Sequence, residues 1–512
     1  MEFQFPSFPL LLAFLIFMLI LLKISTHGKK SRSKSSTLNL PPGPLKLPVI
    51  GNLHNLVCSL PHQRLRDLSN KNGPLMFLQL GEVPHVVVSS SEIAHEIFRV
   101  HDINFSERPF ILSARMYYLI DIAFAAYGDY WRQLRKICKE ELLSSKRVES
   151  FRSIREEEVS NLIGDIVSST RKGEAPINLS EKIFSMTYGI TARASFGKKC
   201  SEQEAFKSSV KEGMKIAGGF SLSDMFPSQR WLYWLSPVGW ELEKNFQVTD
   251  KIFENIISEF KADKATRDPA RMAEEKCLLD VLFDLQENGG LAVPLEKKNI
   301  KAVLLDVFIG GSETSSVTVE WAMLEMLKNP KVMENAQAEV RQVFGKMGNV
   351  DETSLYKLKY LKLIIKETLR LHPPAPLLLP RQARESCVIN GFHIPAKTNV
   401  LVNAWAIGRD PRYWSDAESF KPERFLESSI DFKGTNFEFI PFGAGRRMCP
   451  GMTFAIADIE LPLAQLLFQF DWKLPEGINH ENLNMTERFG LSVRRKEDLY
   501  LIPVPYNSSR SG

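Results

Sequence analysis

Apolar residues recur at the spacing of an α-helix through most of this chain. The clearest positions are Leu358, Leu361, Ile365 and Leu369, together with Val303 and Val307, and Leu304 and Phe308, in a stretch that continues past Lys328. Alternation of apolar and polar residues is confined to short segments such as 84–89 and 388–395, which predict strands of small antiparallel sheets. The pattern therefore predicts a mainly α fold with small antiparallel β-sheets.

A separate apolar segment lies near the N-terminus. The 20 residues from Phe3 to Leu22 carry no charge, which is about the length needed to cross a bilayer as a helix. A cleaved signal peptide is the alternative, but no basic residue precedes the segment and no small-residue cleavage site comes after it. Five basic residues between Lys23 and Lys34 favour the cytosolic side for the rest of the chain. We expect a retained single-pass anchor at residues 1–24.

A basic and proline-rich hinge is expected at residues 25–50. Its PPGP run at 41–44 breaks any helix and favours an extended, semi-rigid backbone. No low-complexity linker divides the chain after residue 50, and the charged run 261–276 is interpreted as a surface loop. Residues 51–512 are therefore expected to form one folded unit.

The excess positive charge belongs to the N-terminal segment. The chain has 512 residues, is 44% hydrophobic and carries a formal net charge of +5. Residues 1–34 hold five basic groups and one acidic group, which gives +4, so the rest of the chain is near +1. A nucleic-acid-binding protein would concentrate basic residues on its folded domain. We therefore set nucleic acid aside as a partner.

One cysteine lies in a loop rich in glycine. Cys449 belongs to the segment 442–451 (FGAGRRMCPG) and precedes the apolar stretch 452–467, so its sulfur is expected at a helix N-terminus. Backbone N–H groups there, with Arg446 and Arg447 beside it, would favour a thiolate. A buried structural cysteine is the ordinary alternative.

The other cysteines limit which metals are plausible. The six cysteines, at 58, 138, 200, 277, 387 and 449, form no Cys-x-x-Cys pair and accompany no histidine cluster. This argues against zinc and iron–sulfur sites. No protease-type signature surrounds Cys449, which argues against a nucleophile. A single axial thiolate to haem iron is the chemistry that remains.

Segment 442–451 resembles the haem-binding loop Phe-x-x-Gly-x-Arg-x-Cys-x-Gly of the cytochrome P-450 superfamily. It matches at Phe442, Gly445, Arg447, Cys449 and Gly451. The resemblance implies the cytochrome P-450 fold, haem b as cofactor and Cys449 as the axial ligand of its iron. It also implies a haem-thiolate catalytic domain, since thiolate ligation in this family favours O–O cleavage.

The segment 310–314 (GGSET) lies within the long apolar stretch. Two glycines cost a helix about 1 kcal/mol each relative to alanine, so they call for a reason. Close helix packing is one; the other is a local opening of the helix at Gly310, with Thr314 and Glu313 delivering protons during O2 activation. The pattern is similar to the family's Ala/Gly-Gly-x-Asp/Glu-Thr, which implies that Thr314 and Glu313 are catalytic.

Glu367 and Arg370 are spaced to share one face of a helix. Glu149 and Arg152 have the same spacing, so the spacing alone says little. The segment 422–425 (PERF) resembles the family segment whose arginine joins that pair, which assigns Arg424 to a buried triad. We expect a structural role, since breaking a buried pair costs roughly 3 to 5 kcal/mol.

Haem carries two propionates, whose burial needs cations and hydrogen-bond donors. Trp131 and Arg135 resemble the family's Trp-x-x-x-Arg, and Arg447 lies two residues before the ligand. The resemblance also matches Arg381, after Pro380, to a propionate position, and Arg108 is a further candidate. The expected cofactor-binding residues are Cys449, Arg447, Trp131, Arg135, Arg381, Phe442 and Gly443.

Arg132, Lys136 and Lys139 form a basic stripe on the same predicted helix. Most such stripes are solvated surface. If the helix packs on the ligand side of the haem, the stripe becomes a docking site for an acidic electron donor. In microsomal members of the family, that donor is a flavoprotein reductase that draws on NADPH.

The resemblance extends to particular members of the family. Segments 129–133 (DYWRQ), 372–376 (HPPAP) and 439–445 (FIPFGAG) look like plant microsomal enzymes of specialised metabolism, and among these most like terpenoid hydroxylases. This implies an enzyme of the endoplasmic reticulum membrane, with its catalytic domain in the cytosol, that hydroxylates a hydrophobic substrate with O2 and NADPH. The expected substrate pocket comprises Phe124, Val303, Gly310, Ala375 and Phe489.

Other functions stay open at this point. The substrate could be an alkaloid or a phenolic compound instead of a sesquiterpene or diterpene. An O2-independent isomerase or dehydratase on the same fold would not need the acid–alcohol pair, so Glu313 and Thr314 speak against it. A membrane-anchored haem-binding or scaffolding protein without turnover is the remaining alternative.

Overall fold

The computed structural model describes residues 39–506, apart from 58, 113, 115–119, 172, 174, 217, 219–220, 230 and 265–275. The expected anchor at 1–24, much of the expected hinge and most of the loop at 261–276 lie outside the described residues. Within the described part, one helix, α15 (Lys297–Lys328), is long and apolar enough to cross a membrane. Because 72% of its most apolar window is buried inside the protein, α15 is a core helix.

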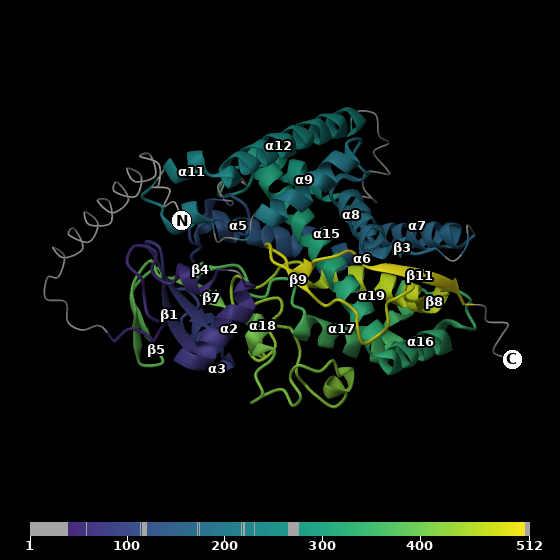
Figure 1. Ribbon diagram of the computed structural model, residues 1–512. Helices are drawn as coiled ribbons and strands as arrows, with labels where there is room; N and C mark the ends of the chain where they lie inside the picture. Colours follow the sequence, from purple (N-terminus) through teal and green to yellow (C-terminus); the bar gives the residue numbers. More distant parts are fainter. Residues whose placement is uncertain are drawn as a thin grey trace, which may run out of the picture.

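Helices make up most of the structure (Figure 1). The longer ones are α2 (Pro61–Asn72), α5 (Asp129–Ile137), α7 (Arg152–Thr170), α8 (Leu179–Phe196), α9 (Gln203–Ile216), α12 (Pro237–Lys264), α14 (Leu278–Asn288), α15, α16 (Pro330–Phe344), α17 (Lys359–Leu371) and α19 (Met452–Gln469). The shorter helical segments are η1 (Leu53–Asn55), α3 (Ser91–His95), η2 (Glu96–Val100), η3 (Cys138–Leu142), α6 (Ser145–Ser150), α10 (Leu222–Met225), α11 (Trp231–Leu235), η4 (Glu352–Lys357), α18 (Ala404–Ile407) and η5 (Pro422–Phe425).

The strands form small sheets. They are β1 (Leu75–Leu80), β2 (Val83–Val88), β3 (Ile177–Asn178), β4 (Arg381–Gln382), β5 (Cys387–Ile389), β6 (Phe392–Ile394), β7 (Asn399–Val402), β8 (Phe470–Lys473), β9 (Glu487–Arg488), β10 (Arg494–Arg495) and β11 (Tyr500–Pro505). The largest sheet has the order β1-β2-β7-β4, and the others are β3-β11-β8, β9-β10 and β5-β6. The expected mainly α fold with small sheets is confirmed.

Two details of the sheets differ from the sequence-based expectation. The strand expected at 84–89 is β2, but it pairs in parallel with β7, placing Val86 opposite Val400. The segment 388–395 contains a hairpin turn and not one strand, because Asn390 and Gly391 both adopt positive φ, at 48° and 77°. Positive φ at both central residues is what a two-residue hairpin loop requires.

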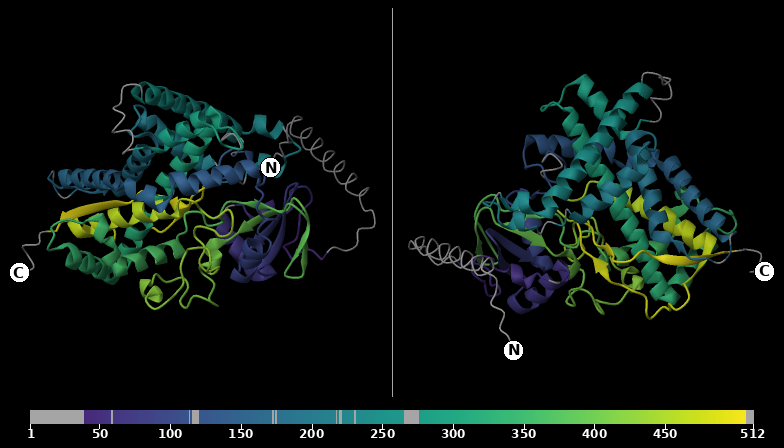
Figure 2. Two further views of the ribbon diagram at one scale, coloured as in Figure 1. Left: turned by 180° about the vertical axis from the view of Figure 1, so that it is seen from behind. Right: turned by 45° about the horizontal axis from the view of Figure 1, so that its top comes forward.

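The sheet-bearing part and the helical part lie side by side. Figure 1 places β1, β2, β4 and β7 with α2 and α3 on one side, and Figure 2 shows the same separation from behind. Helix α15 runs through the helical part and packs most extensively against α8. Because apolar residues surround α15 on nearly all sides, it forms the centre of the hydrophobic core.

Candidate active site

A cavity of about 320 Å³ lies where α15, α5 and the loop before α19 meet. Most of the predicted site residues line it, from segments far apart in the sequence. They are Thr314, Gly310, Cys449, Arg447, Trp131, Arg135, Arg381, Phe442, Gly443, Phe124 and Ala375. Its size falls at the lower end of the range for small-molecule sites.

The loop before α19 holds Cys449 at the cavity wall. The backbone N–H of Cys449 donates to the Phe442 carbonyl at 3.0 Å, closing the loop. Gly445 has φ of 70°, and a Cβ there would lie 2.6 Å from both Asp102 Oδ1 and the Phe98 carbonyl oxygen. Glycine is therefore required at 445. The sulfur of Cys449 lies just before Gly451, the N-cap of α19.

The electrostatic surroundings of Cys449 differ from the expectation. Cys449 is exposed toward the cavity, but the surrounding protein atoms limit its hydration and raise the pKa of its thiol, while the Gly451 N–H and the nearby Arg135 act in the opposite direction. Arg446 instead forms an ion pair with Asp102, with 3.3 Å between Nε and Oδ2. Arg447 also turns away and donates to backbone carbonyls. The expectation that Arg446 and Arg447 stabilise the thiolate was wrong, because Arg135 on α5 is the neighbouring cation.

Three arginines, Arg108, Arg381 and Arg447, line the same cavity as the Cys449 sulfur, and Arg381 and Arg447 are buried. Arg108 donates to the carbonyls of Leu379 and Pro380 at 2.7 and 2.6 Å. Burial lowers the pKa of Arg447 and of Arg381 to about 10, and Arg381 further lowers that of Arg447. Burial and the two neighbouring guanidinium groups hold the pKa of Arg108 well below its usual range. Cations whose charged forms are disfavoured by burial and by neighbouring cations are stabilised by an anion placed among them.

This arginine cluster fits the carboxylates of haem. Within the described chain, the hydrogen bonds of Arg108 and Arg447 go only to backbone carbonyls, whereas Arg381 also reaches Asp102 at 3.3 Å. Two buried guanidinium groups without a carboxylate hydrogen-bond partner suit the two propionates. A cysteine sulfur facing the same cavity completes a donor set that fits haem b.

The two glycines on the α15 wall of the cavity, Gly310 and Gly311, have different surroundings. A Cβ on Gly310 would meet no atom within 4 Å, whereas one on Gly311 would lie 3.0 Å from Thr191 Oγ1 on α8. Gly310 thus leaves space at the cavity, and Gly311 allows helix packing. The helix itself is continuous from Lys297 to Lys328, so the expected local opening is absent from the described backbone of α15.

Thr314 lines the cavity, whereas the side chain of Glu313 does not. Thr314 faces the cavity, and its hydroxyl donates to the Gly310 carbonyl at 2.6 Å. Glu313 is buried behind the wall, where its Oε1 accepts from Ser492 Oγ at 3.2 Å and lies 3.7 Å from Arg494 Nη1. Ser492 lines the cavity, so Glu313 reaches it through one hydroxyl.

Two carboxyl groups that sequence reasoning missed also line the cavity. Asp306 Oδ2 accepts from the backbone N–H groups of Ile122 and Ala123 at 2.6 and 3.1 Å, and Asp121 Oδ1 accepts from Phe124 N at 2.6 Å. Burial raises the pKa of Asp121 to about 6, and burial beside Asp121 raises that of Asp306 well above its usual range. The signal available in the sequence was Asp306 itself, an acidic residue two helical turns before Thr314.

Of the expected substrate residues, Phe124, Gly310 and Ala375 line this cavity, Phe489 lines a second one and Val303 lines neither. Val303 is buried in the hydrophobic core and does not line the site; Val307, one turn later, does. Phe489 lines a neighbouring cavity of about 270 Å³. The two cavities share the residues Phe124, Ala375, Leu378 and Leu491. These four residues therefore form the junction between them.

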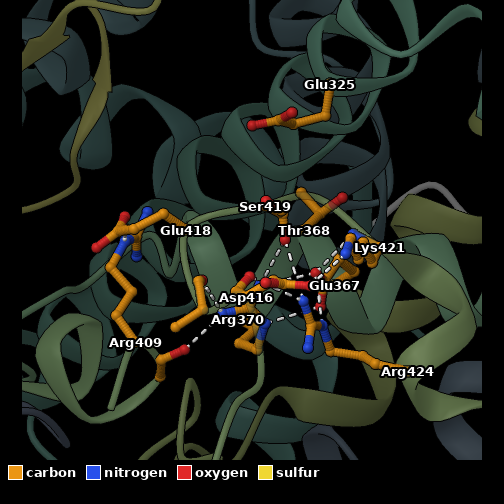
Figure 3. Close-up of polar contacts among 12 residues, drawn as sticks. Glu325, Glu367, Thr368, Arg370, Arg409, Asp416, Glu418, Ser419, Lys421 and Arg424 are labelled. Atoms are coloured by element: carbon orange, nitrogen blue, oxygen red, sulfur yellow. Dashed lines mark hydrogen bonds and ion pairs between the residues drawn. The ribbon is translucent and has the colours of Figure 1, made fainter. Parts of the chain in front are cut away.

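Glu367, Arg370 and Arg424 come together outside the cavity (Figure 3). Arg370 binds both oxygens of Glu367, at 2.7 and 2.8 Å, and Arg424 Nε donates to Glu367 Oε1 at 2.9 Å. The Glu367 and Arg370 side chains are fully buried. From η5, ring contacts run through Phe425, Phe439 and Phe432 to Phe442, which links the triad to the Cys449 loop.

Comparisons with known proteins agree with this geometry. A family model described as Cytochrome P450 matches residues 41–502. Desmethyl-deoxy-podophyllotoxin synthase of Sinopodophyllum hexandrum is 54% identical over 508 residues, covering 98% of this chain and 97% of that protein. Premnaspirodiene oxygenase of Hyoscyamus muticus is 49% identical over 509 residues (99% and 100%). Tabersonine 16-hydroxylase 1 of Catharanthus roseus is 52% identical over 505 residues (98% of each).

The fold is also similar to that of solved structures. A zebra fish cytochrome P450 solved with progesterone superposes with a TM-score of 0.74 at 25% identity. The match covers 88% of this chain and 100% of that one. The family model spans most of the described residues and includes Cys449, Thr314 and the arginine cluster. The chain belongs to the cytochrome P450 family and is a haem-dependent monooxygenase.

Proposed function

We propose that this protein inserts one oxygen atom from O2 into a terpenoid, as a sesquiterpene or diterpene hydroxylase. The single observation that carries the proposal is that Cys449, the arginine cluster and Thr314 line one cavity whose remaining walls are largely apolar. An O2-independent isomerase would have no use for a hydroxyl at Thr314. The buried Glu313 behind Ser492 adds a second proton-carrying group.

Haem b would be held by Cys449 at its iron and by the arginine cluster at its propionates. Trp131, Arg135, Phe442 and Gly443 would form the adjoining walls. Thiolate-ligated haem, when bound, supplies the activation of O2 that the insertion requires. The protein's own contribution is to fix the sulfur, neutralise the propionates and exclude water from the apolar side.

Thr314 is proposed to hold a proton at the α15 wall. Its hydroxyl already donates to the Gly310 carbonyl, so its own lone pairs can accept a proton donor from the cavity. Ser492 is the route by which Glu313 could exchange protons with the cavity, because its hydroxyl bonds Glu313 Oε1. An alcohol and a carboxylic acid in this arrangement can relay protons.

The substrate assignment follows from the shape and chemistry of the walls. The apolar lining comes from α15, from the turn at Ala375 and from the segment around Phe124, with members such as Val307, Ile309, Leu378 and Leu379. This favours a hydrocarbon skeleton. The named relatives act on terpenoids, lignans and alkaloids. An alkaloid is the second candidate, because a relative named tabersonine 16-hydroxylase 1 is 52% identical to this chain.

The electron donor is proposed to be an NADPH-dependent flavoprotein reductase. Arg132, Lys136 and Lys139 are all exposed on the outer side of α5 and η3, while Arg135 faces the cavity on the Cys449 side. This arrangement supports a stripe on the ligand side of the proposed haem. Arg132 pairs with Asp129 and Lys136 lies 3.9 Å from Glu140, so part of its charge is compensated.

Localisation and domain organisation belong to the same proposal. We infer that residues 1–24 anchor the protein in the endoplasmic reticulum membrane and that residues 25–50 form the hinge. Residues 51–512 would be the haem-thiolate catalytic domain on the cytosolic side. This places the domain where a membrane-bound reductase and hydrophobic substrates are available.

The function can be tested in microsomes that contain the protein and a reductase. Premnaspirodiene and tabersonine would be incubated separately with NADPH under ¹⁸O2, and products analysed by mass spectrometry. We expect one ¹⁸O atom in a premnaspirodiene-derived alcohol. Labelled product from tabersonine alone would favour the alkaloid assignment. Conversion without label, or without NADPH, would contradict the monooxygenase assignment to these substrates.

A further inference from the structure

A buried charged cluster lies beside the junction of the two cavities. Glu487, on β9, accepts hydrogen bonds at Oε2 from His62 Nε2 at 2.9 Å and from Gln63 Nε2 at 3.0 Å. Its other oxygen lies 3.9 Å from His372 Nδ1, at ion-pair distance. The His62 side chain is 0% exposed and that of Glu487 is 7% exposed. The cluster therefore sits inside the protein.

Neighbouring groups fix the cluster on both sides. His372 Nε2 lies 2.7 Å from Glu325 Oε1, and its ring stacks on Trp321 of α15 with 4.0 Å between centroids. The carbonyl of His62 accepts from Asn403 Nδ2 at 2.7 Å. Burial alone would raise the pKa of Glu487, but the two histidines hold it well below its usual range. Glu487 is therefore a fixed negative charge.

Each end of this cluster continues into a turn that lines a cavity. Glu487 is two residues before Phe489, whose turn reaches Leu491 at the junction. His372 ends α17 and is followed by Pro373 and Pro374, which lead to Ala375 at the same junction. The chain just after the first turn bonds the second one, because Val493 N donates to the Pro374 carbonyl at 2.8 Å.

We propose that Glu487 is a positioning residue for the substrate cavity, which holds the turn at Phe489–Leu491 against the turn at Ala375 through His62, Gln63 and His372. The inference rests on the proposed function to the extent that the cavity receives the substrate. Without Glu487, the donors of His62 and Gln63 would be left unpaired in a buried site, and the turn would have to move to satisfy them. A displacement of about 1 Å can cost 100-fold in rate at a given carbon.

Two azole ligands separate a positioning role from a general structural one. Imidazole is a single small ring and needs little of the cavity. Clotrimazole carries two phenyl rings and one chlorophenyl ring, and its size is expected to bring it into contact with the junction residues. Binding of each would be followed by the shift in the haem spectrum, which requires no turnover and no knowledge of the natural substrate.

The main variant is Glu487→Gln in the full-length haem protein. Glutamine keeps one acceptor oxygen but removes the negative charge that strengthens these hydrogen bonds. We therefore expect clotrimazole to bind about 10-fold more weakly and imidazole to bind as in the wild type. Glu487→Asp should restore part of the loss. The matched control is Glu497→Gln. Glu497 is an exposed carboxylate two residues after β10, and its Oε2 accepts from Asn484 Nδ2.

Hydrogen exchange gives a second, independent readout. The N–H of Leu491 donates to the Met214 carbonyl at 3.0 Å and that of Val493 to Pro374, so both amides report on the turn. Their exchange should accelerate in Glu487→Gln and not in Glu497→Gln. If Glu487→Gln fails to bind haem, Gln63→Met removes one donor outside the cavity and should show smaller changes of the same kind.

The proposal would be overturned by a variant that binds haem normally and keeps both the wild-type clotrimazole affinity and the wild-type exchange rates at Leu491 and Val493. Equal weakening of both azoles would also overturn it, because that result indicates general loosening around the iron. If the terpenoid assignment failed, azole binding and hydrogen exchange could still be measured. A failure of the proposed function is therefore distinguishable from a failure of the proposed role of Glu487.

Discussion

The guanidinium of Arg447 lies over the indole ring of Trp131, with 4.2 Å between Cζ and the ring centroid. Arg447 belongs to the Cys449 loop, and Trp131 to α5. Both side chains also bind the loop 122–125. Trp131 Nε1 donates to the Ile122 carbonyl at 3.0 Å, and Arg447 Nη2 donates to the Ala125 carbonyl at 2.6 Å. A desolvated cation over a tryptophan face can contribute about 2 kcal/mol.

We predict that Trp131→Leu lowers haem retention. The substitution removes both the aromatic face beneath Arg447 and the indole N–H, so the guanidinium loses its orientation. Haem release should be about 10-fold faster or more, measured by transfer to excess apomyoglobin. Trp240→Leu is the control, since Trp240 is 73% exposed. Equal release rates for wild type and Trp131→Leu would remove Trp131 from the haem site.

Glu367→Gln should strongly destabilise the fold. Glu367 is fully buried and binds Arg370 and Arg424, so neutralising it leaves buried guanidinium groups without their counter-charge, at about 3 to 5 kcal/mol. Glu149→Gln is a matched control, because Glu149 and Arg152 have the same spacing on the surface. Denaturant unfolding of both variants gives the comparison. A loss no greater than that of the control would rule out a structural triad.

Thr314→Ala is expected to bind haem and substrate normally while diverting reducing equivalents to hydrogen peroxide. The physical reason is that the cavity loses the hydroxyl that holds a proton on the α15 wall. Peroxide formed per NADPH consumed is the measurement, and Thr314→Ser should recover coupling. Ser312→Ala is the control, since Ser312 makes the same kind of backbone bond, to Phe308, but does not line the cavity. Wild-type coupling in Thr314→Ala would exclude the role.

Much of the site could be predicted because its chemistry is local in sequence. The loop 442–451 carries its own turn signals, and Gly445 needs glycine for reasons visible in the structure. The Glu367 and Arg370 pair lies within one helical turn. Such short-range features could be recognised because they match motifs of the cytochrome P450 family, although the spacing of Glu367 and Arg370 alone says little.

The parts that could not be predicted depend on distant segments. Helix α15 is apolar on nearly all sides, so its sequence pattern does not reveal how far the cavity extends along the helix. Val303 lies one helical turn beyond the end of the cavity. Glu313 turns to Ser492 and Arg494, whose position depends on β10. The parallel pairing of β2 with β7 joins strands separated by several helices.

Ala375→Phe should change the position oxidised or exclude larger substrates, with normal haem content. Ala375 belongs to the junction that both cavities share, so a ring there narrows the passage and shifts the substrate relative to the iron. Product profiles with premnaspirodiene, analysed by mass spectrometry, provide the test. The same products in the same ratio from a well-folded variant would show that Ala375 only packs the turn.

The central claim is that Cys449 is the thiolate ligand of a haem in this cavity, and the absorption spectrum of the reduced carbon monoxide complex tests it most directly. We predict that the wild type shows the band specific to thiolate ligation and that Cys449→Ala loses this band and all turnover. Cys387→Ala, at a half-buried cysteine on β5, should leave the spectrum unchanged. A Cys449→Ala protein that keeps the thiolate band and its activity would contradict the account.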